Sequence, residues 1–361
     1  MLPLLGGSYN PSSLHAEGRA ARASLDAARD AVAGVLGASA REIVFTGGGS
    51  EADVLAVVGT ARALAARGRH VVTTAIEHHA VLHAVDVLER DGWRVTRLPV
   101  DARGLVDPAA FAAALTPETT LASVIWANNE IGVVQPIVEL ARLARARGVV
   151  FHTDAVQAAG WLPLAVDALG IDLLSLSGHK FHGPKGVGML YVRQGTAIEP
   201  LIVGGGQEQG LRSGTEDVAG IVGFATALSL AEAERPAAAA RVEALRDRLE
   251  AGIVANVPDA VVNGAGAPRL PGCLSVAFAD VPSDALLIRL DLEGIAAAAG
   301  SACAAGSLEP SHVAAALRLD ERHRRGVIRF SLGRSTNAAE IDHVLEHFPA
   351  LIASVRAPVA V

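Results

Sequence analysis

Extended and helical segments alternate through the middle of the chain, and this alternation restricts the possible folds more than any other feature of the sequence. Runs typical of strands lie at residues 71–76, 94–100, 121–127, 149–154, 173–177 and 188–192. Helical patterns lie between several of them, at residues 50–68, 81–90 and 136–147. This order predicts an α/β fold with a mainly parallel sheet flanked by helices on both faces. In such folds, ligands bind at the carboxyl ends of the strands.

The pattern changes at Arg235-Pro236, where a helix expected over residues 215–234 ends. Beyond this point the sequence predicts helices at residues 237–255, 283–292 and 338–355, and strands at residues 273–279 and 327–332. We therefore expect a large domain over residues 1–235 and a smaller C-terminal α+β domain over residues 236–361.

Composition argues against several classes of protein. No apolar run reaches the roughly 18 to 20 residues that span a bilayer, and residues 1–10 lack the pattern of a secretion signal. The two cysteines stand in different contexts, which fits a reducing compartment and not a disulfide framework. The net charge of -7, without a long basic run, argues against nucleic acid as the partner. We expect a cytoplasmic protein that binds neither membrane nor nucleic acid.

Lys180 and Asp154 each stand at the end of a predicted strand. A lysine is usually an exposed surface residue, but Lys180 opens a tight glycine-rich turn, where partial desolvation can make an amine nucleophilic at neutral pH. Asp154 taken alone could equally be a helix N-cap. Together the two residues match the needs of pyridoxal phosphate (PLP). This cofactor requires an amine for a Schiff base and a carboxylate that keeps its pyridine nitrogen protonated.

A glycine turn, residues 46–50, follows the predicted strand at residues 43–45 and opens a helix. Backbone N–H groups at a helix N-terminus suit a phosphate, although an ordinary tight turn would have the same sequence. The turn is not a P-loop, because the Gly-Lys-Ser/Thr ending is absent.

Short motifs occur in order along nearly the whole chain, at residues 10–15, 77–78, 128–133, 152–157, 177–188, 204–215, 301–303, 307–311 and 328–334. As a set, they resemble the cysteine desulfurases of the NifS/IscS-like group in the class V aminotransferase family. The resemblance implies the PLP-dependent transferase fold of type I and a homodimer. It also implies conversion of L-cysteine to L-alanine, with transfer of the sulfur to an acceptor protein such as an iron–sulfur scaffold.

The same resemblance implies a role for each matching residue. Lys180 would bind PLP as a Schiff base and move the Cα proton of the substrate, and Asp154 would pair with the pyridine nitrogen. His78 would stack on the ring as a further catalytic residue, and Gln157 would bond its phenolic oxygen.

The phosphate and the substrate have their own implied residues. The phosphate would be bound by Gly49, Ser50, Ser177 and His179, and by Thr215 of the neighbouring subunit. Asn129 and Arg329 would bind the substrate carboxylate, for which a planar guanidinium is well shaped.

Cys303 lies among small residues, in a stretch from residue 296 to 307 that predicts a mobile loop. A free cysteine is most often a buried core residue, but this stretch has no large apolar neighbours. The resemblance implies that the Cys303 thiolate receives the sulfur as a persulfide. Cys273, by contrast, stands in an alternating strand pattern, and we expect it in the core.

Other interpretations stay open. The same scaffold could carry a selenocysteine lyase or another aminotransferase of this class. The chain begins only a few residues before Asn10, where relatives have a longer segment, so a catalytically impaired homologue is a further alternative. His78, His79 and His83 could suggest zinc, but His78 and His83 are five residues apart and no further ligand stands nearby in the sequence, so we expect no metal.

Overall fold

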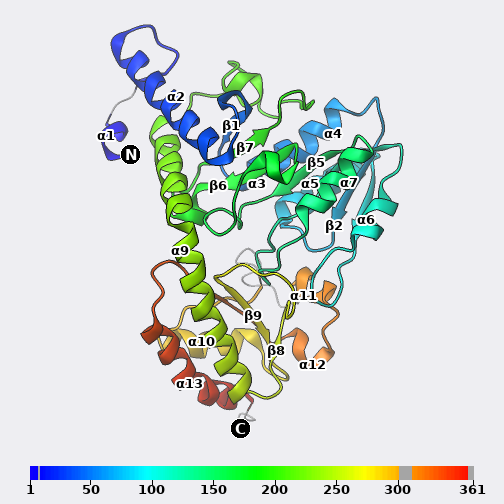
Figure 1. Ribbon diagram of the computed structural model, residues 1–361, viewed down its shortest axis with the longest axis vertical. Helices are drawn as coiled ribbons and strands as arrows, with labels where there is room; N and C mark the ends of the chain where they lie inside the picture. Colours follow the sequence, from blue (N-terminus) through cyan, green and yellow to red (C-terminus); the bar gives the residue numbers. More distant parts are fainter. Residues whose placement is uncertain (7–8, 301–310, 357–361) are drawn as a thin grey trace. The chain divides into compact units, whose positions relative to one another are not determined.

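The computed structural model describes residues 1–6, 9–300 and 311–356 (Figure 1). Contacts divide the chain into two compact units. Unit 1 comprises Met1–Leu98, Pro108–Trp126 and Pro136–Arg235, and unit 2 comprises Pro99–Asp107, Ala127–Gln135 and Pro236–Val361. The division into domains at residues 1–235 and 236–361 stays a prediction, and two short stretches before residue 136 group with unit 2. Within the described ranges, each helix is too short or too polar to cross a bilayer.

A mainly parallel sheet forms the centre of unit 1, which confirms the predicted α/β fold (Figure 1). In the described residues it has seven strands, in the order β1-β7-β6-β5-β4-β2-β3. The strands are β1 (Ile43–Thr46), β2 (His70–Thr74), β3 (Arg94–Leu98), β4 (Thr119–Ser123), β5 (Val150–Asp154), β6 (Leu173–Ser177) and β7 (Gly188–Val192). The pairs from β3 to β6 are parallel, whereas β7 runs antiparallel to both β6 and β1.

The register between β5 and β6 positions the predicted site. Asp154, the last residue of β5, pairs with Ser175 of β6. All residues of β6 are buried, as expected for a parallel strand covered on both faces. The carboxyl ends of β5 and β6 therefore lie side by side, and the turn after β6 begins next to Asp154.

Helices flank this sheet, and those predicted at residues 50–68, 81–90 and 136–147 are present among them. They are α1 (Leu2–Leu5), α2 (Ala16–Leu36), α3 (Gly49–Val54), α4 (Thr60–Ala63), α5 (His79–Arg90), α6 (Pro108–Ala114), α7 (Ile137–Ala146) and α8 (Val166–Leu169). The predicted helix at residues 50–68 consists of α3, a π-helical segment η2 (Leu55–Gly59) and α4, and it ends earlier, at Ala63. A π-helical turn inside a helix is frequent near functional sites.

The predicted helix break at Arg235-Pro236 is wrong. A single helix, α9 (Val218–Asn256), continues through Pro236. Proline removes one backbone hydrogen bond and crowds the preceding turn, at a cost of about 3 kcal/mol. The flanking stretches are rich in alanine, leucine and glutamate, which favour helix strongly enough to continue on both sides.

A buried ion pair ties α2 to β1. Both Nη atoms of Arg29 donate to the Glu208 carboxylate, at 2.7 and 2.6 Å. Arg29 also donates to the carbonyl of Ile43 at 2.7 Å, and the N–H of Phe45 donates to Glu208 at 2.8 Å. Glu208 adopts a φ of 48°, which is uncommon outside glycine, so these contacts hold a strained segment in place.

Unit 2 has a small antiparallel sheet, in the order β10-β9-β8. Its described strands are β8 (Val261–Val262), β9 (Cys273–Ala277) and β10 (Val327–Ser331). Its helices, besides the end of α9, are α10 (Ser283–Leu292), α11 (His312–Ala316), α12 (Glu321–Arg324) and α13 (Ala338–Arg356). Helix α10 packs against α13 and β10, and this arrangement is of the α+β type.

Candidate active site

The glycine turn lies next to the ends of β5 and β6. A Cβ atom at Gly49 would lie 2.8 Å from Cγ2 of Val156 and 3.2 Å from Cβ of Ser177, so only glycine permits this approach. A Cβ atom at Gly188 would likewise lie 2.4 Å from the carbonyl carbon of Gly48. The structure thus brings together the start of α3 and the segments after β5 and β6.

Lys180 lies in a tight 3-10 turn, η3 (Gly178–Phe181), that follows β6 directly. Within this turn, the Ser177 hydroxyl and His179 Nδ1 are 2.9 Å apart and hydrogen-bonded. His182 ends the turn with a φ of 67°. The side chain of Lys180 is exposed, so the expected partial desolvation is not provided by the described residues.

Lysine is rare in this sequence, and its placement is a signal that sequence reasoning missed. Lys180 and Lys185 are the two lysines among 31 basic Lys and Arg residues, and both stand in the turn after β6. Arginine cannot replace lysine where an amine must react, because its guanidinium stays protonated.

Asp154 is buried at the carboxyl end of β5, with 3% of its surface exposed. Its Oδ1 accepts a hydrogen bond from the N–H of Val156 at 2.9 Å. Burial raises the pKa of Asp154 to about 6, against the opposing effects of this hydrogen bond and of the positive charge of Lys180. The strands β5 and β6 are neighbours and the charge of Lys180 lowers the pKa of Asp154, so the two residues lie at the same edge of the sheet.

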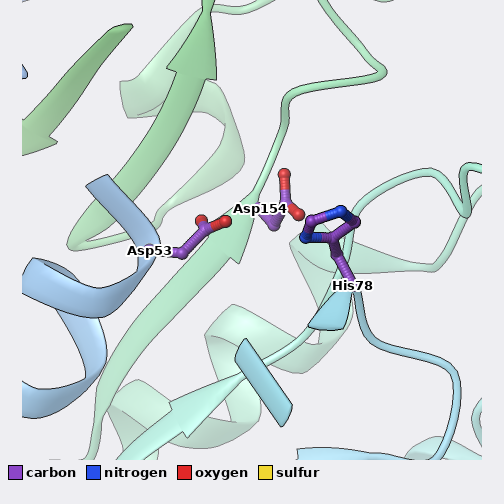
Figure 2. Close-up of side chains that lie close together, drawn as sticks. All are labelled: Asp53, His78 and Asp154. Carbon is purple, nitrogen blue, oxygen red and sulfur yellow. The ribbon is translucent and has the colours of Figure 1, made fainter. Parts of the chain in front are cut away.

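Two further buried acids accompany Asp154, and the sequence analysis assigned neither of them a role. Asp53 lies in α3 and is 1% exposed, and Figure 2 shows it reaching toward Asp154. Glu77 follows β2 and is fully buried. Its Oε1 accepts hydrogen bonds from the Thr74 hydroxyl at 2.6 Å and from the N–H of Ile125 at 2.9 Å. An acidic residue in a helix or turn is normally exposed to solvent, so nothing in the sequence indicated that Asp53 and Glu77 are buried.

His78 is half-buried and caps the start of α5, where its Nδ1 accepts from the N–H of Ala80 at 3.1 Å. One ligand atom each of His78, Asp53 and Asp154 lie within 4.8 Å of one another (Figure 2). A neutral imidazole that accepts at Nδ1 carries its proton at Nε2, which then has no lone pair for a metal. This cluster is therefore poorly suited to a metal ion, and the ring is oriented by its backbone contact.

The other predicted residues of unit 1 lie at or near the same segments. Gln157 follows β5 and is half-buried, and Ser50 is exposed at the start of α3. Thr215 is exposed, in the segment before α9. Nothing in a single chain tests its predicted role in a neighbouring subunit, which stays a prediction.

A second polar cluster lies in unit 2. The Nη1 of Arg329, in β10, donates to the backbone carbonyl of Asn129 at 2.5 Å, while its Nε is buried without a hydrogen-bond partner in the described ranges. The Ser311 hydroxyl donates to Glu130 Oε2 at 2.5 Å. Burial raises the pKa of Glu130, and Ser311, His312 and Arg329 oppose this. The structure thus brings Asn129 and Arg329 together.

The two cysteines differ in what the structure shows. Cys273 is buried in β9, as predicted, and burial raises the pKa of its thiol to about 11. A thiol with such a pKa is unreactive at neutral pH. Cys303 lies outside the described residues, so its predicted role stays a prediction.

The model of the aminotransferase class-V family matches residues 5–344. The chain belongs to the class-V aminotransferase family. This confirms the resemblance seen in the sequence, and the family is one whose members use PLP.

A curated family member of Cereibacter sphaeroides, a cysteine desulfurase, is 49% identical over 360 residues, which are 99% of this chain and 92% of that protein. A cysteine desulfurase IscS of Dictyoglomus turgidum is 44% identical over 357 residues, 99% of this chain and 91% of that one.

Solved structures of the family agree with the fold. A NifS-like protein superposes with a TM-score of 0.90 at 36% identity, covering 98% of this chain and 94% of that one. A structure described as SspA in complex with cysteine has a TM-score of 0.80 at 37% identity, covering 92% of this chain and 93% of that one. These likenesses confirm the PLP-dependent transferase fold of type I.

The Glu77 carboxyl predicts a pH dependence of stability. Burial raises its pKa from 4.5 to about 8, so between these values the folded chain binds a proton that the unfolded chain releases. The free energy of unfolding therefore falls as pH rises from about 4.5 to about 8, by about 1.4 kcal/mol per pKa unit at most. In Glu77→Gln, which is neutral throughout, the melting temperature of the apoprotein should fall less between pH 5 and pH 8.

Thermal unfolding followed by circular dichroism measures this difference. Glu118→Gln, which neutralises an exposed acid, is the matched control and should keep the wild-type pH dependence. Equal pH dependence in Glu77→Gln and wild type would show that Glu77 titrates as an ordinary acid.

Proposed function

We propose that this chain is a PLP-dependent cysteine desulfurase that converts L-cysteine to L-alanine and transfers the sulfur, by way of Cys303, to an acceptor. One observation carries the proposal: in a member of this family, Lys180 lies in the turn directly after β6, and the buried carboxyl of Asp154 ends the neighbouring strand β5. The curated relatives, named cysteine desulfurases, support the choice of reaction. The relative solved in complex with cysteine supports the choice of substrate.

The residues of unit 1 fit PLP chemically. When bound, PLP supplies an electron-accepting ring that makes the Cα–H bond of an attached amino acid acidic. Lys180 offers the amine that would attach it, and Asp154 the carboxylate for its pyridine nitrogen. His78 offers an imidazole face, oriented by its bond to Ala80, and Gln157 an amide for the phenolic oxygen. The carboxylate of Asp154, when ionised, would pair with the protonated pyridine nitrogen of PLP.

The phosphate would take the donors at the start of α3. Gly49 lacks a side chain where it approaches Ser177, which leaves backbone N–H groups available at this helix start. The donors would be the N–H groups of Gly49 and Ser50, the Ser177 hydroxyl and the His179 ring. We propose that Thr215 of a second copy completes this set, and therefore that the chain is a homodimer.

Lys180 would act on the substrate as a base. With the cofactor bound, the Lys180 amine would be the base that accepts the Cα proton of the substrate and returns a proton later. The thiolate of Cys303 attacks the substrate sulfur and forms an S–S bond. The C–S bond breaks, its electron pair stays with the substrate carbon, and protonation of that carbon gives alanine. The persulfide then passes its outer sulfur to a thiol of the acceptor protein.

Arg329 and Asn129 would bind the carboxylate of cysteine. The Nε of Arg329 is buried without a partner in the described residues, and an unsatisfied buried guanidinium nitrogen favours an anionic ligand. In Arg329→Lys, one point charge replaces the planar fork. We expect KM for cysteine to rise about 10- to 100-fold with a smaller change in kcat, since a carboxylate contact is made equally before and during reaction.

Steady-state kinetics with cysteine would measure this split. Arg289→Lys is the matched control, because Arg289 is an exposed arginine of the same unit. An unchanged KM in Arg329→Lys would remove Arg329 from the substrate site.

The function itself is tested by incubating purified protein and PLP with cysteine and measuring alanine and sulfide. Equal release of both is expected. Turnover of selenocysteine with none of cysteine would instead indicate a selenocysteine lyase, and transfer of the amino group to a keto acid would indicate an aminotransferase. We further propose that the protein works in the cytoplasm and serves a sulfur-acceptor protein such as an iron–sulfur scaffold.

A further inference from the structure

Asp53 is a buried carboxyl group to which the proposed reaction assigns no role. It lies in α3, one turn after Ser50, and its Oδ1 has no hydrogen-bond partner in the parts of the chain that the structure describes. One of its oxygens lies within 4.8 Å of an oxygen of Asp154. Figure 2 shows the two carboxyl groups approaching from different elements, α3 and β5. An acid buried in this way requires a physical explanation.

His152 lies beside Asp53 but does not neutralise it. The distance from His152 Nε2 to Asp53 Oδ1 is 3.7 Å, too long for a hydrogen bond. The two ring nitrogens are instead bonded to the hydroxyls of Ser123 at 2.8 Å and Ser175 at 3.0 Å. Complete burial lowers the pKa of His152 to about 3, so the ring is neutral at physiological pH. A charge on Asp53 would therefore gain no counter-ion from His152.

Asp53 and Asp154 lie close enough to compete for one negative charge, because two charges in a buried site repel. Asp154 accepts the N–H of Val156 and feels the positive charge of Lys180, and both stabilise its ionised form. For Asp53, only a hydrogen bond with Ser175 favours the ionised form. Burial, the charge of Asp154 and, to a smaller extent, Glu77 raise the pKa of Asp53 well above its usual range.

We propose that Asp53 is a positioning residue that keeps its proton, so that the negative charge of this buried pair resides on Asp154. The inference rests on the proposed function, because a pyridinium nitrogen needs that charge on Asp154. The neutral Asp53 carboxyl fills the space beside Asp154 and excludes water from it, and it adds no second charge. Asp53 acts through Asp154 and touches neither substrate nor cofactor.

Three variants separate charge from position when PLP binding to the apoprotein is titrated by visible absorbance. Asp53→Asn keeps a neutral group of the same shape, and its PLP Kd should stay within about threefold of wild type. Asp53→Ala opens space beside Asp154 and should weaken PLP binding about tenfold. Asp154→Asn removes the charge itself and should weaken PLP binding at least about 100-fold. We therefore expect PLP binding to be weakened in Asp53→Ala but to stay near the wild-type level in Asp53→Asn.

Two outcomes would overturn the proposal. Loss of PLP binding in Asp53→Asn as large as in Asp154→Asn would mean that Asp53 carries the charge. Wild-type binding in Asp53→Ala, together with an unchanged pH titration of the bound-cofactor absorbance, would mean that Asp53 does not act through Asp154. If Asp53→Ala fails to fold, the asparagine variant alone still decides whether the charge lies on Asp53.

A second measurement needs no cofactor. Infrared spectra of the apoprotein at pH 7 should contain carbonyl bands of protonated, buried carboxylic acids, and Asp53→Asn should lose the one that belongs to Asp53. Glu77→Gln is the control for the other buried acid and should leave the Asp53 band in place. An unchanged band in Asp53→Asn would refute the inference. If wild-type protein took up no PLP at all, the proposed function would fail while this spectrum still reported on Asp53.

Discussion

Lys180→Ala should abolish cysteine desulfuration, lowering the rate by at least about a thousandfold. Lys180 supplies both the amine that would attach PLP and the base that would move the Cα proton, and an arginine could do neither because its guanidinium group stays protonated. Borohydride reduction followed by mass spectrometry should locate the cofactor on Lys180 in wild type and find no attached cofactor in the variant. Alanine production measures the loss of activity.

Lys185→Ala is an unusually close control for this experiment. Lys185 stands in the same connection between β6 and β7, is also exposed and is the other lysine of the sequence. Its removal should leave cofactor attachment and activity within about twofold of wild type, as for most surface substitutions. Attachment to Lys185, or retained activity in Lys180→Ala, would contradict the assignment of Lys180.

Cys303→Ser should stop the release of sulfide from cysteine, with a loss of at least about 100-fold, while PLP binding stays at the wild-type level. A serine hydroxyl does not ionise at neutral pH and cannot form a persulfide. The expected combination is therefore a protein with the normal cofactor spectrum that no longer accumulates alanine. Mass spectrometry of wild type after a single addition of cysteine should find one extra sulfur on the peptide that contains Cys303.

Cys273→Ala separates this effect from a general loss of a thiol. Cys273 is buried in β9, and burial raises its thiol pKa to about 11, so it should take no part in sulfur transfer. The variant should keep its activity and lose only modest stability, about 1 kcal/mol for a small core truncation. Full sulfide release by Cys303→Ser would contradict the proposed sulfur route.

The central strands could be predicted from the sequence because clear local signals mark where they begin and end. The strands β6 and β7 begin and end where predicted, since an apolar run is followed in each case by turn or charged residues. Helix α9 was mispredicted because a proline is normally a break, and the helix-forming residues around Pro236 outweighed that rule. The π-helical segment η2 could not be predicted, because its residues have no distinctive pattern.

The site could be predicted in part. Lys180 and Asp154 stand out because chemistry-bearing residues directly follow predicted strands. Asp53 does not stand out in the sequence, because its burial is a tertiary effect. It depends on the close approach of α3 to β5 and β6, which glycine at position 49 permits. The bond between Arg329 and Asn129 likewise joins segments far apart in sequence, and only the resemblance to the family indicated it.

The ion pair of Arg29 and Glu208 has a consequence for the edge of the sheet as well as for local order. Strand β1 ends the sheet order, pairing with β7 along one side, so its other side presents backbone groups that another extended chain could bind. Arg29 bonds the carbonyl of Ile43, and Glu208 accepts the N–H of Phe45, which occupies those groups with side chains. The pair thereby occupies two backbone groups at the open edge of β1, which are then not available for pairing with another strand.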